Sequence, residues 1–128
     1  IQVALNTVDI DRCALSVIAT IISKPTEDRA IMDAGSKALA LDKGAHGVSN
    51  VNGFGIVKNI GGVTIERLSE EHGILKLEAE GKNIKIGDRI EIIPNHACTV
   101  VNLFDYVNIV EKNMVNERYK VEARGRVW

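Results

Sequence analysis

Short runs rich in β-branched residues recur roughly every ten residues along this chain, and glycine or proline separates them. Helical periodicity is weak, whereas residues 74–80 alternate apolar and charged side chains with the two-residue period of a half-buried strand. Helical turns are expected only near residues 36–41 and 98–104. The sequence predicts a first strand ended by Pro25, a final hairpin, and strands at residues 13–23, 29–32, 54–58, 63–68, 74–80, 89–93, 106–111 and 118–127.

This spacing of strands and turns is typical of antiparallel sheets that close on themselves or stack. We therefore expect a mainly β fold, an antiparallel β-barrel or sandwich with one or two short helical turns. The chain has 128 residues, of which 45% are hydrophobic, enough to bury one core. It contains no internal repeat, low-complexity tract or linker, so residues 1–128 are interpreted as a single β-domain.

The charge balance excludes some classes of partner. The chain has sixteen basic and seventeen acidic residues, and this net charge of -1 predicts no nucleic-acid partner. The longest apolar stretch, Val17 to Ile22, is far shorter than the ~20 residues that cross a membrane, so no membrane partner is expected. Two cysteines, Cys13 and Cys98, are too few for a disulfide framework, which favours a cytoplasmic location. Cys13 lies in an apolar run and is predicted to be a core residue.

The segment from Pro94 to Asn102 carries the clearest chemistry. His96 and Cys98 lie two residues apart, directly after a predicted strand, so both side chains can point toward one place. Imidazole nitrogen and thiolate sulfur are good zinc ligands. Two ligands make only half of a metal site, and the same spacing is compatible with a structural histidine beside a buried cysteine. The spacing alone leaves both interpretations open.

Three other places combine chemically useful residues, and each has a simpler interpretation. Glu70 and Glu71 precede His72 and could tune its imidazole, or the stretch could be a polar turn between strands. Residues 33–37 (DAGSK) could offer backbone N–H groups to a phosphate, or form a turn that begins a helix. His46, within the glycine-rich stretch 42–53, is interpreted as an exposed loop histidine.

The order of these segments resembles a known family. The runs that carry the likeness are CALSVIATIISKPTEDRAIMDAGSKAL, GIV, ERLSEEHGILKL, KIGDRIEIIPNHACTVVNLFD and ARGRVW. Together they are similar to the C-terminal β-domain of D-threonine aldolase-like and D-serine dehydratase-like enzymes. These enzymes have the alanine racemase-type architecture, in which a (β/α)8 barrel that holds pyridoxal phosphate precedes the β-domain. The resemblance extends from about Cys13 to Arg126.

The resemblance implies a role for this domain. It implies a metal ion, zinc or another divalent metal, held by His96 and Cys98 beside the cofactor and acting on the β-hydroxyl of a small D-amino acid. It leaves no cofactor-binding residue here, because the lysine that carries pyridoxal phosphate lies in the barrel. We therefore expect this chain to be an inactive fragment by itself, whose partners are the missing (β/α)8 barrel and a second subunit of a homodimer. Asn95 and Asn102 are candidates for orienting the ligands through hydrogen bonds, and structural roles in turns are an equal alternative.

Several points stay open at the level of sequence. A thiolate at the second ligand position favours zinc and is similar to the dehydratases, whereas the aldolases more often have an aspartate there. The reaction is therefore D-serine dehydration or D-threonine aldol cleavage. No catalytic residue is assigned, and His72 is the one candidate. The alternatives are a non-enzymatic β-barrel binding module, an amino-acid racemase-like domain, and a separate chain that works with a barrel-only protein.

Overall fold

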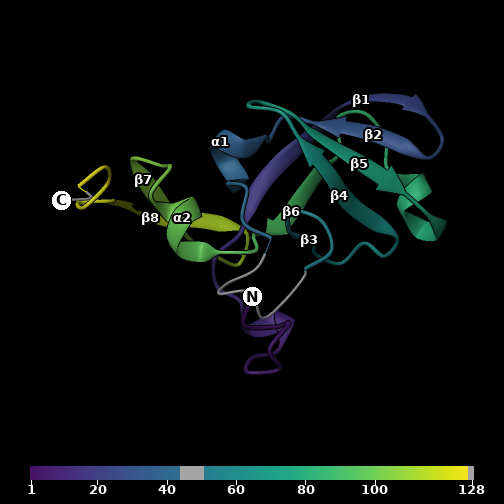
Figure 1. Ribbon diagram of the computed structural model, residues 1–128. Helices are drawn as coiled ribbons and strands as arrows, with labels where there is room; N and C mark the ends of the chain where they lie inside the picture. The colour runs from purple at the N-terminus through teal and green to yellow at the C-terminus, as the bar shows by residue number, and fades with distance from the viewer. Residues whose placement is uncertain (44–50, 127–128) are drawn as a thin grey trace.

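The computed structural model describes residues 1–43 and 51–126, and its main feature is a closed antiparallel barrel of six strands (Figure 1). Around the barrel the order is β1-β2-β5-β4-β3-β6. Its strands are β1 (Val17–Thr26), β2 (Arg29–Met32), β3 (Ile56–Val57), β4 (Val63–Leu68), β5 (Gly73–Leu77) and β6 (Arg89–Ile93). The mainly β fold expected from the sequence is confirmed, and of the two architectures it is the barrel.

Two strands and four short helical segments lie outside the barrel wall. The strands β7 (Tyr106–Glu111) and β8 (Met114–Lys120) form a separate hairpin. The helical segments are η1 (Ile10–Arg12), α1 (Ser36–Leu39), η2 (Ala79–Asn83) and α2 (Ala97–Val101). The α-helices α1 and α2 coincide with the two predicted helical turns. None of the helices in the described ranges is long and apolar enough to cross a membrane.

The ten-residue strand β1 closes the barrel because it pairs with a neighbour on each side. Its first half pairs with β6, Val17 opposite Ile92, and its second half pairs with β2, Ile21 opposite Met32. The register shifts twice between Ile21 and Thr26, which bends the strand. The predicted stop at Pro25 is wrong, because proline is tolerated where a ladder is interrupted.

The barrel core consists of alternate residues on each strand. Ile21 and Met32 are fully buried, and Ile18, next to the buried Ala19 on β1, is 61% exposed. The other core side chains include Ala19, Ala30, Ile65, Leu75, Leu77, Ile90 and Ile92. The prediction that Cys13 belongs to this core is wrong, since it precedes β1 and is only half-buried.

Three further strand boundaries differ from the sequence prediction. The run 54–58 forms strand only at Ile56–Val57, and the run 74–80 leaves the ladder after Leu77 to form η2. The last strand occupies Met114–Lys120 rather than 118–127. A two-residue turn at Lys112 and Asn113, both with positive φ, joins it to β7, as tight hairpins require.

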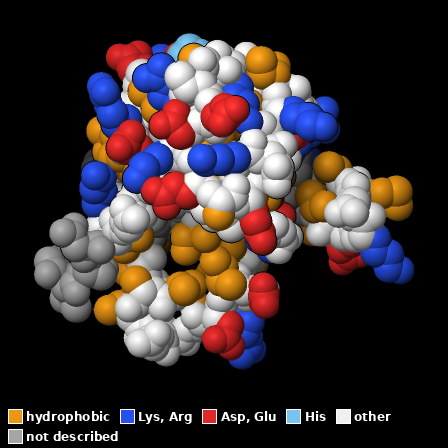
Figure 2. Space-filling view, turned by 90° about the vertical axis from the view of Figure 1, so that its right-hand side faces the viewer, with side chains coloured by type: hydrophobic (Ala, Val, Ile, Leu, Met, Phe, Trp, Pro, Cys, Tyr) orange, Lys and Arg blue, Asp and Glu red, His pale blue; other side chains and the backbone are white. Residues whose placement is uncertain are grey.

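The surface carries charges of both signs on the barrel and apolar groups on the hairpin. Figure 2 shows acidic and basic side chains intermixed over one face of the molecule. In the hairpin, Ile109, Val110, Met114 and Val115 are between 42% and 65% exposed. Two strands alone are marginally stable in water, so this exposed apolar surface is a place where a partner would stabilise the hairpin.

Gly73 gives a test of how tightly the barrel is packed. A Cβ at this position would lie 2.2 Å from Met32 Cε and 2.8 Å from the carbonyl oxygen of Ala34. We predict that Gly73→Ala lowers the free energy of unfolding by about 1–3 kcal/mol, as overpacking of a core does. Gly61→Ala is the matched control, because a Cβ there meets only the flexible Glu80 carboxylate at 3.3 Å. Equal urea midpoints for the two variants would contradict this account of the core.

Candidate metal centre

The predicted ligand pair lies where the chain leaves β6 and enters α2. After Ile93, Pro94 and Asn95 are buried, and His96 is the N-cap residue of α2 with extended backbone dihedrals. Its side chain makes no capping hydrogen bond, so the imidazole is free for another contact. Cys98 follows in the first turn of the helix and is exposed. Two residues apart, the two Cα atoms are separated by at most about 7 Å.

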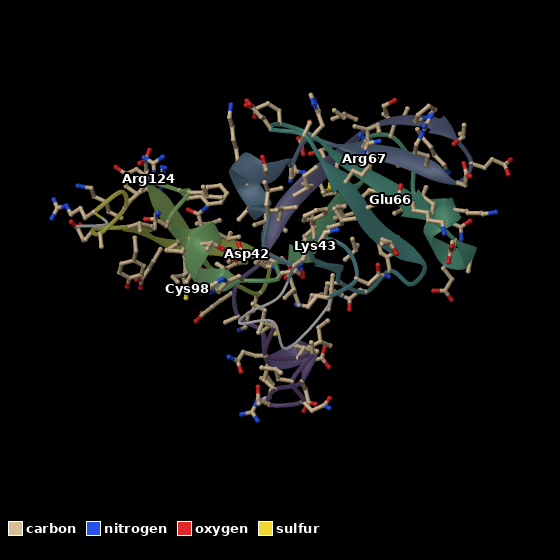
Figure 3. The ribbon with its side chains drawn as sticks, viewed as in Figure 1. Asp42, Lys43, Glu66, Arg67, Cys98 and Arg124 are labelled. Atoms are coloured by element: carbon tan, nitrogen blue, oxygen red, sulfur yellow. The ribbon has the colours of Figure 1, made fainter. Side chains whose placement is uncertain are left out.

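His96 points its Nδ1 atom at a carboxylate that the sequence analysis missed. Asp42 follows α1, and its Oδ1 atom lies 3.1 Å from His96 Nδ1. The other oxygen, Oδ2, accepts a hydrogen bond of 3.0 Å from the hydroxyl of Thr99. Both carboxylate oxygens are therefore engaged by groups from α2 and its N-cap. Figure 3 shows Asp42 and Cys98 at this end of the molecule, beside α2.

The environment keeps Asp42 ionised at neutral pH. Burial alone would raise the pKa of Asp42, but the hydrogen bonds with His96 and Thr99 outweigh it and hold that pKa below its ordinary value. An ionised carboxylate only accepts hydrogen bonds, so the contact with His96 requires a hydrogen on Nδ1. In neutral imidazole that leaves Nε2 with its lone pair available. With 35% of the His96 side chain exposed, the ring is open to a ligand from outside.

Asn95 holds the backbone around Asp42. It is only 6% exposed, and its amide nitrogen donates to the carbonyl oxygens of Asp42, at 2.8 Å, and Gly53, at 3.0 Å. Gly53 has φ +77°, and a Cβ there would lie 2.8 Å from the Ile65 carbonyl oxygen. The ammonium group of Lys43 lies 4.5 Å from the centre of the Phe54 ring. These contacts fasten both ends of the segment 42–53 beside the ligand pair.

Residues 33–37 (DAGSK) and residues 69–73 (SEEHG) pack against each other. The backbone N–H groups of Ser36 and Lys37 donate to the carbonyl oxygens of Ser69 and Glu70, at 2.8 and 3.1 Å, and so are not free for a phosphate. The Lys37 ammonium pairs with Glu71 at 2.6 Å, and this hydrogen bond raises the pKa of Lys37. For residues 33–37 the helix-starting turn is therefore the better interpretation.

The remaining predicted residues lie apart from this cluster or have structural roles. His72 is exposed in the turn between β4 and β5, and its backbone N–H donates to the hydroxyl of Ser69 at 3.1 Å. Residues 69–72 form the polar turn between β4 and β5, and a catalytic role for His72 stays a prediction. Asn102 accepts a hydrogen bond from the backbone of Gly125 and so connects α2 to the C-terminal segment. His46 lies outside the described residues.

Comparison with known proteins identifies the family. The sequence profile described as the putative serine dehydratase domain matches residues 14–110. The chain belongs to this family. An uncharacterized protein of Mycobacterium tuberculosis is 33% identical over 129 residues, which cover 92% of each chain. The D-serine dehydratase of Dictyostelium discoideum is 32% identical over 93% of this chain and 32% of its own length.

Solved structures of other family members share the fold. The D-threonine aldolase from Filomicrobium marinum is 31% identical and aligns with a TM-score of 0.75 over 88% of this chain and 29% of its own. The D-threo-3-hydroxyaspartate dehydratase from Delftia sp. HT23 is 29% identical, with a TM-score of 0.71 over 84% of this chain and 31% of its own. The chain thus spans about a third of the length of the named enzymes it matches.

Asn95 generates a prediction about how the centre is held together. We predict that Asn95→Ala lowers the free energy of unfolding by about 1–3 kcal/mol, because it leaves two carbonyl oxygens without their donor. Asn95→Asp is expected to cost more at pH 7, since a carboxylate would face both carbonyls. Its carboxyl pKa would be raised in the folded state, so this variant recovers relative to wild type as the pH falls toward 4. Urea unfolding at both pH values measures this.

Asn116→Ala is the matched control for the Asn95 variants, because its amide makes one exposed hydrogen bond to Glu111 on the hairpin. It is expected to change stability by less than about 0.5 kcal/mol. An Asn95→Ala variant as stable as this control would mean that the amide does not anchor the backbone of Asp42.

Proposed function

We propose that this chain is the metal-bearing domain of a pyridoxal-phosphate-dependent lyase that acts on D-3-hydroxy amino acids. The ion, zinc or another divalent metal, is held by His96 and Cys98. One observation carries the proposal: the imidazole and the thiol lie on the same first turn of α2, and the ring nitrogen that would not bind metal is engaged by Asp42. Family membership gives the reaction class, since the named relatives are D-amino-acid lyases.

The chemistry of the donor set fits such an ion. A histidine nitrogen and a cysteine thiolate suit zinc, and catalytic sites leave positions open for water and substrate. Within residues 1–43 and 51–126, no group of three or more His, Cys, Asp or Glu side chains is arranged to hold a metal ion, so the proposed site has two protein ligands from the described part of the chain. Cys98 is exposed. That argues against the alternative of a binding module in which it is a buried structural thiol.

A relative supports the same pair of residue types. The D-threo-3-hydroxyaspartate dehydratase has been solved as two variants, in which a histidine and a cysteine two positions apart are each replaced by alanine. The structure of the cysteine variant is described as a metal-free form. His96 and Cys98 have the same types and the same spacing. We therefore assign them the corresponding role in this chain.

In the proposed enzyme, this chain supplies the metal ligands and the (β/α)8 barrel supplies the cofactor. When bound, the ion supplies Lewis acidity toward a substrate hydroxyl, and pyridoxal phosphate on the (β/α)8 barrel supplies an electron sink. His96 and Cys98 hold the ion where the chain passes from β6 to α2, and Asp42 contacts the histidine ring there. His72 stays a candidate catalytic group. The proposed enzyme contains this domain and the barrel, either in one longer chain or as two chains. It is proposed to be a cytoplasmic homodimer.

Metal binding by the 128-residue chain tests the ligand assignment. We predict that it binds one Co²⁺ with a thiolate-to-metal charge-transfer band in the near ultraviolet, and that zinc displaces it. Cys98→Ser is expected to remove the band, and His96→Ala to weaken zinc binding more than about 100-fold, beyond what loss of a group that only orients a ligand costs. Titration calorimetry and absorption spectroscopy measure both.

Cys13→Ser is the matched control, because this half-buried thiol precedes β1 and lies outside the candidate centre. Its spectrum and affinity are expected to equal those of wild type. Loss of the band in Cys13→Ser but not in Cys98→Ser would refute the assignment, as would saturable zinc binding that survives His96→Ala.

The product formed by the complete gene product distinguishes the two reactions. Dehydration of D-serine gives pyruvate and ammonia, whereas aldol cleavage of D-threonine gives glycine and acetaldehyde. The thiolate at the second ligand position favours dehydration, so pyruvate is the expected product, and a chelator is expected to suppress it. Racemisation of either amino acid without these products would favour the racemase-like alternative. The M. tuberculosis relative matches over 92% of its own length, as would be expected of a domain that works with a separate barrel chain. The assay therefore also includes this domain together with a separate barrel protein.

A further inference from the structure

Asp42 contacts His96 from a segment that lies 54 residues earlier in the chain, and its surroundings fix its carboxylate in place. Oδ1 faces His96 Nδ1 at 3.1 Å, while Oδ2 is 3.0 Å from the Thr99 hydroxyl. The carbonyl oxygen of the same residue accepts from Asn95. Two groups from the β6–α2 corner therefore contact the carboxylate, and a third holds the backbone of the same residue.

We infer that Asp42 is a positioning residue, which holds the His96 imidazole by its Nδ1–H so that Nε2 faces the metal. Only the part of this inference that concerns a metal on Nε2 rests on the proposed function. The hold on the ring is a property of the metal-free chain. A carboxylate is acceptor-only when ionised, so the contact selects the tautomer with hydrogen on Nδ1. Histidine ligands are commonly oriented in this way by a carboxylate on the far ring nitrogen.

Thr99 supports the contact between Asp42 and His96 by binding to Asp42 rather than to the histidine ring. Its hydroxyl oxygen lies within hydrogen-bonding distance of both Asp42 Oδ2 and the His96 carbonyl oxygen, at 3.0 and 3.1 Å. The side chain is thus placed to stop the carboxylate from rotating away from the ring. Because Oδ1 faces Nδ1, on the other side of the ring from Nε2, Asp42 is not placed to ligate an ion held by Nε2.

The test begins with the metal-free chain labelled with ¹⁵N, at a pH where His96 is neutral. Long-range ¹H–¹⁵N spectra are expected to show hydrogen on Nδ1 in wild type and a shift toward the Nε2–H tautomer in Asp42→Ala. Zinc affinity, from competition with a chelating dye, is expected to fall about 10–100-fold in that variant. Thr99→Val, which keeps the side-chain shape, is expected to cause a smaller fall of several-fold.

Two further variants keep the result interpretable. Asp42→Asn retains an acceptor oxygen without charge and is near-isosteric, so it is expected to keep the tautomer and lose less affinity than Asp42→Ala. Asp105→Asn removes one negative charge close to α2 from a residue that pairs with Arg124 and not with His96. It is expected to match wild type in both measurements.

The outcomes separate the two proposals. An Nε2–H tautomer in wild type, or an unchanged tautomer and a zinc affinity within twofold of wild type in Asp42→Ala, overturns the positioning role. A loss in Asp42→Asn as large as in His96→Ala would make Asp42 a ligand and also overturns it. If His96→Ala binds zinc as wild type does, the metal assignment fails, and the tautomer in the metal-free chain still decides the role of Asp42.

Discussion

The candidate centre depends on the closure of the barrel by β1. This one strand pairs with β6 through its first half and with β2 through its second, and so closes the sheet on itself; the register shifts lie in the second half. Closure fixes where β6 ends, and Asn95 and His96 follow one residue later, after Pro94. It also fixes the path of the chain beyond β2, through α1 to Asp42. Two segments distant in sequence therefore meet at one end of the barrel.

Local pattern was sufficient for the bounds of four strands. Residues 29–32, 63–68, 89–93 and 106–111 form strands with the predicted bounds. The errors occur where backbone geometry overrides side-chain pattern. Pro25 lies within β1 because the ladder is irregular there, and the last strand begins early because Lys112 and Asn113 adopt positive φ. Such exceptions depend on pairing partners, which a single run of residues does not reveal.

The same contrast applies to the candidate centre. His96 and Cys98 are two residues apart, so their spacing alone was enough to suggest a shared site. Asp42 gives no such signal, because it reaches the histidine only through the closed barrel. The role predicted for Asn95 in orienting a ligand stays a prediction. Asn95 acts on the backbone of Asp42 and Gly53, one step further from the ligand than expected.

A centre with only two protein ligands depends more on the orientation of each than a four-ligand structural site does. In a closed site the other ligands restrain the ion when one ring turns, whereas here a rotated imidazole would leave the thiolate alone. The exposed position of the pair adds to this demand, since about a third of the His96 side chain faces water and solvent competes for its nitrogen atoms. Asn95 donates a hydrogen bond to the backbone carbonyl of Asp42, and Thr99 donates one to its carboxylate. Together they restrain the residue that contacts the histidine ring. In the proposed centre, rigid support from the barrel is thus what would allow two ligands to hold an ion in an exposed position.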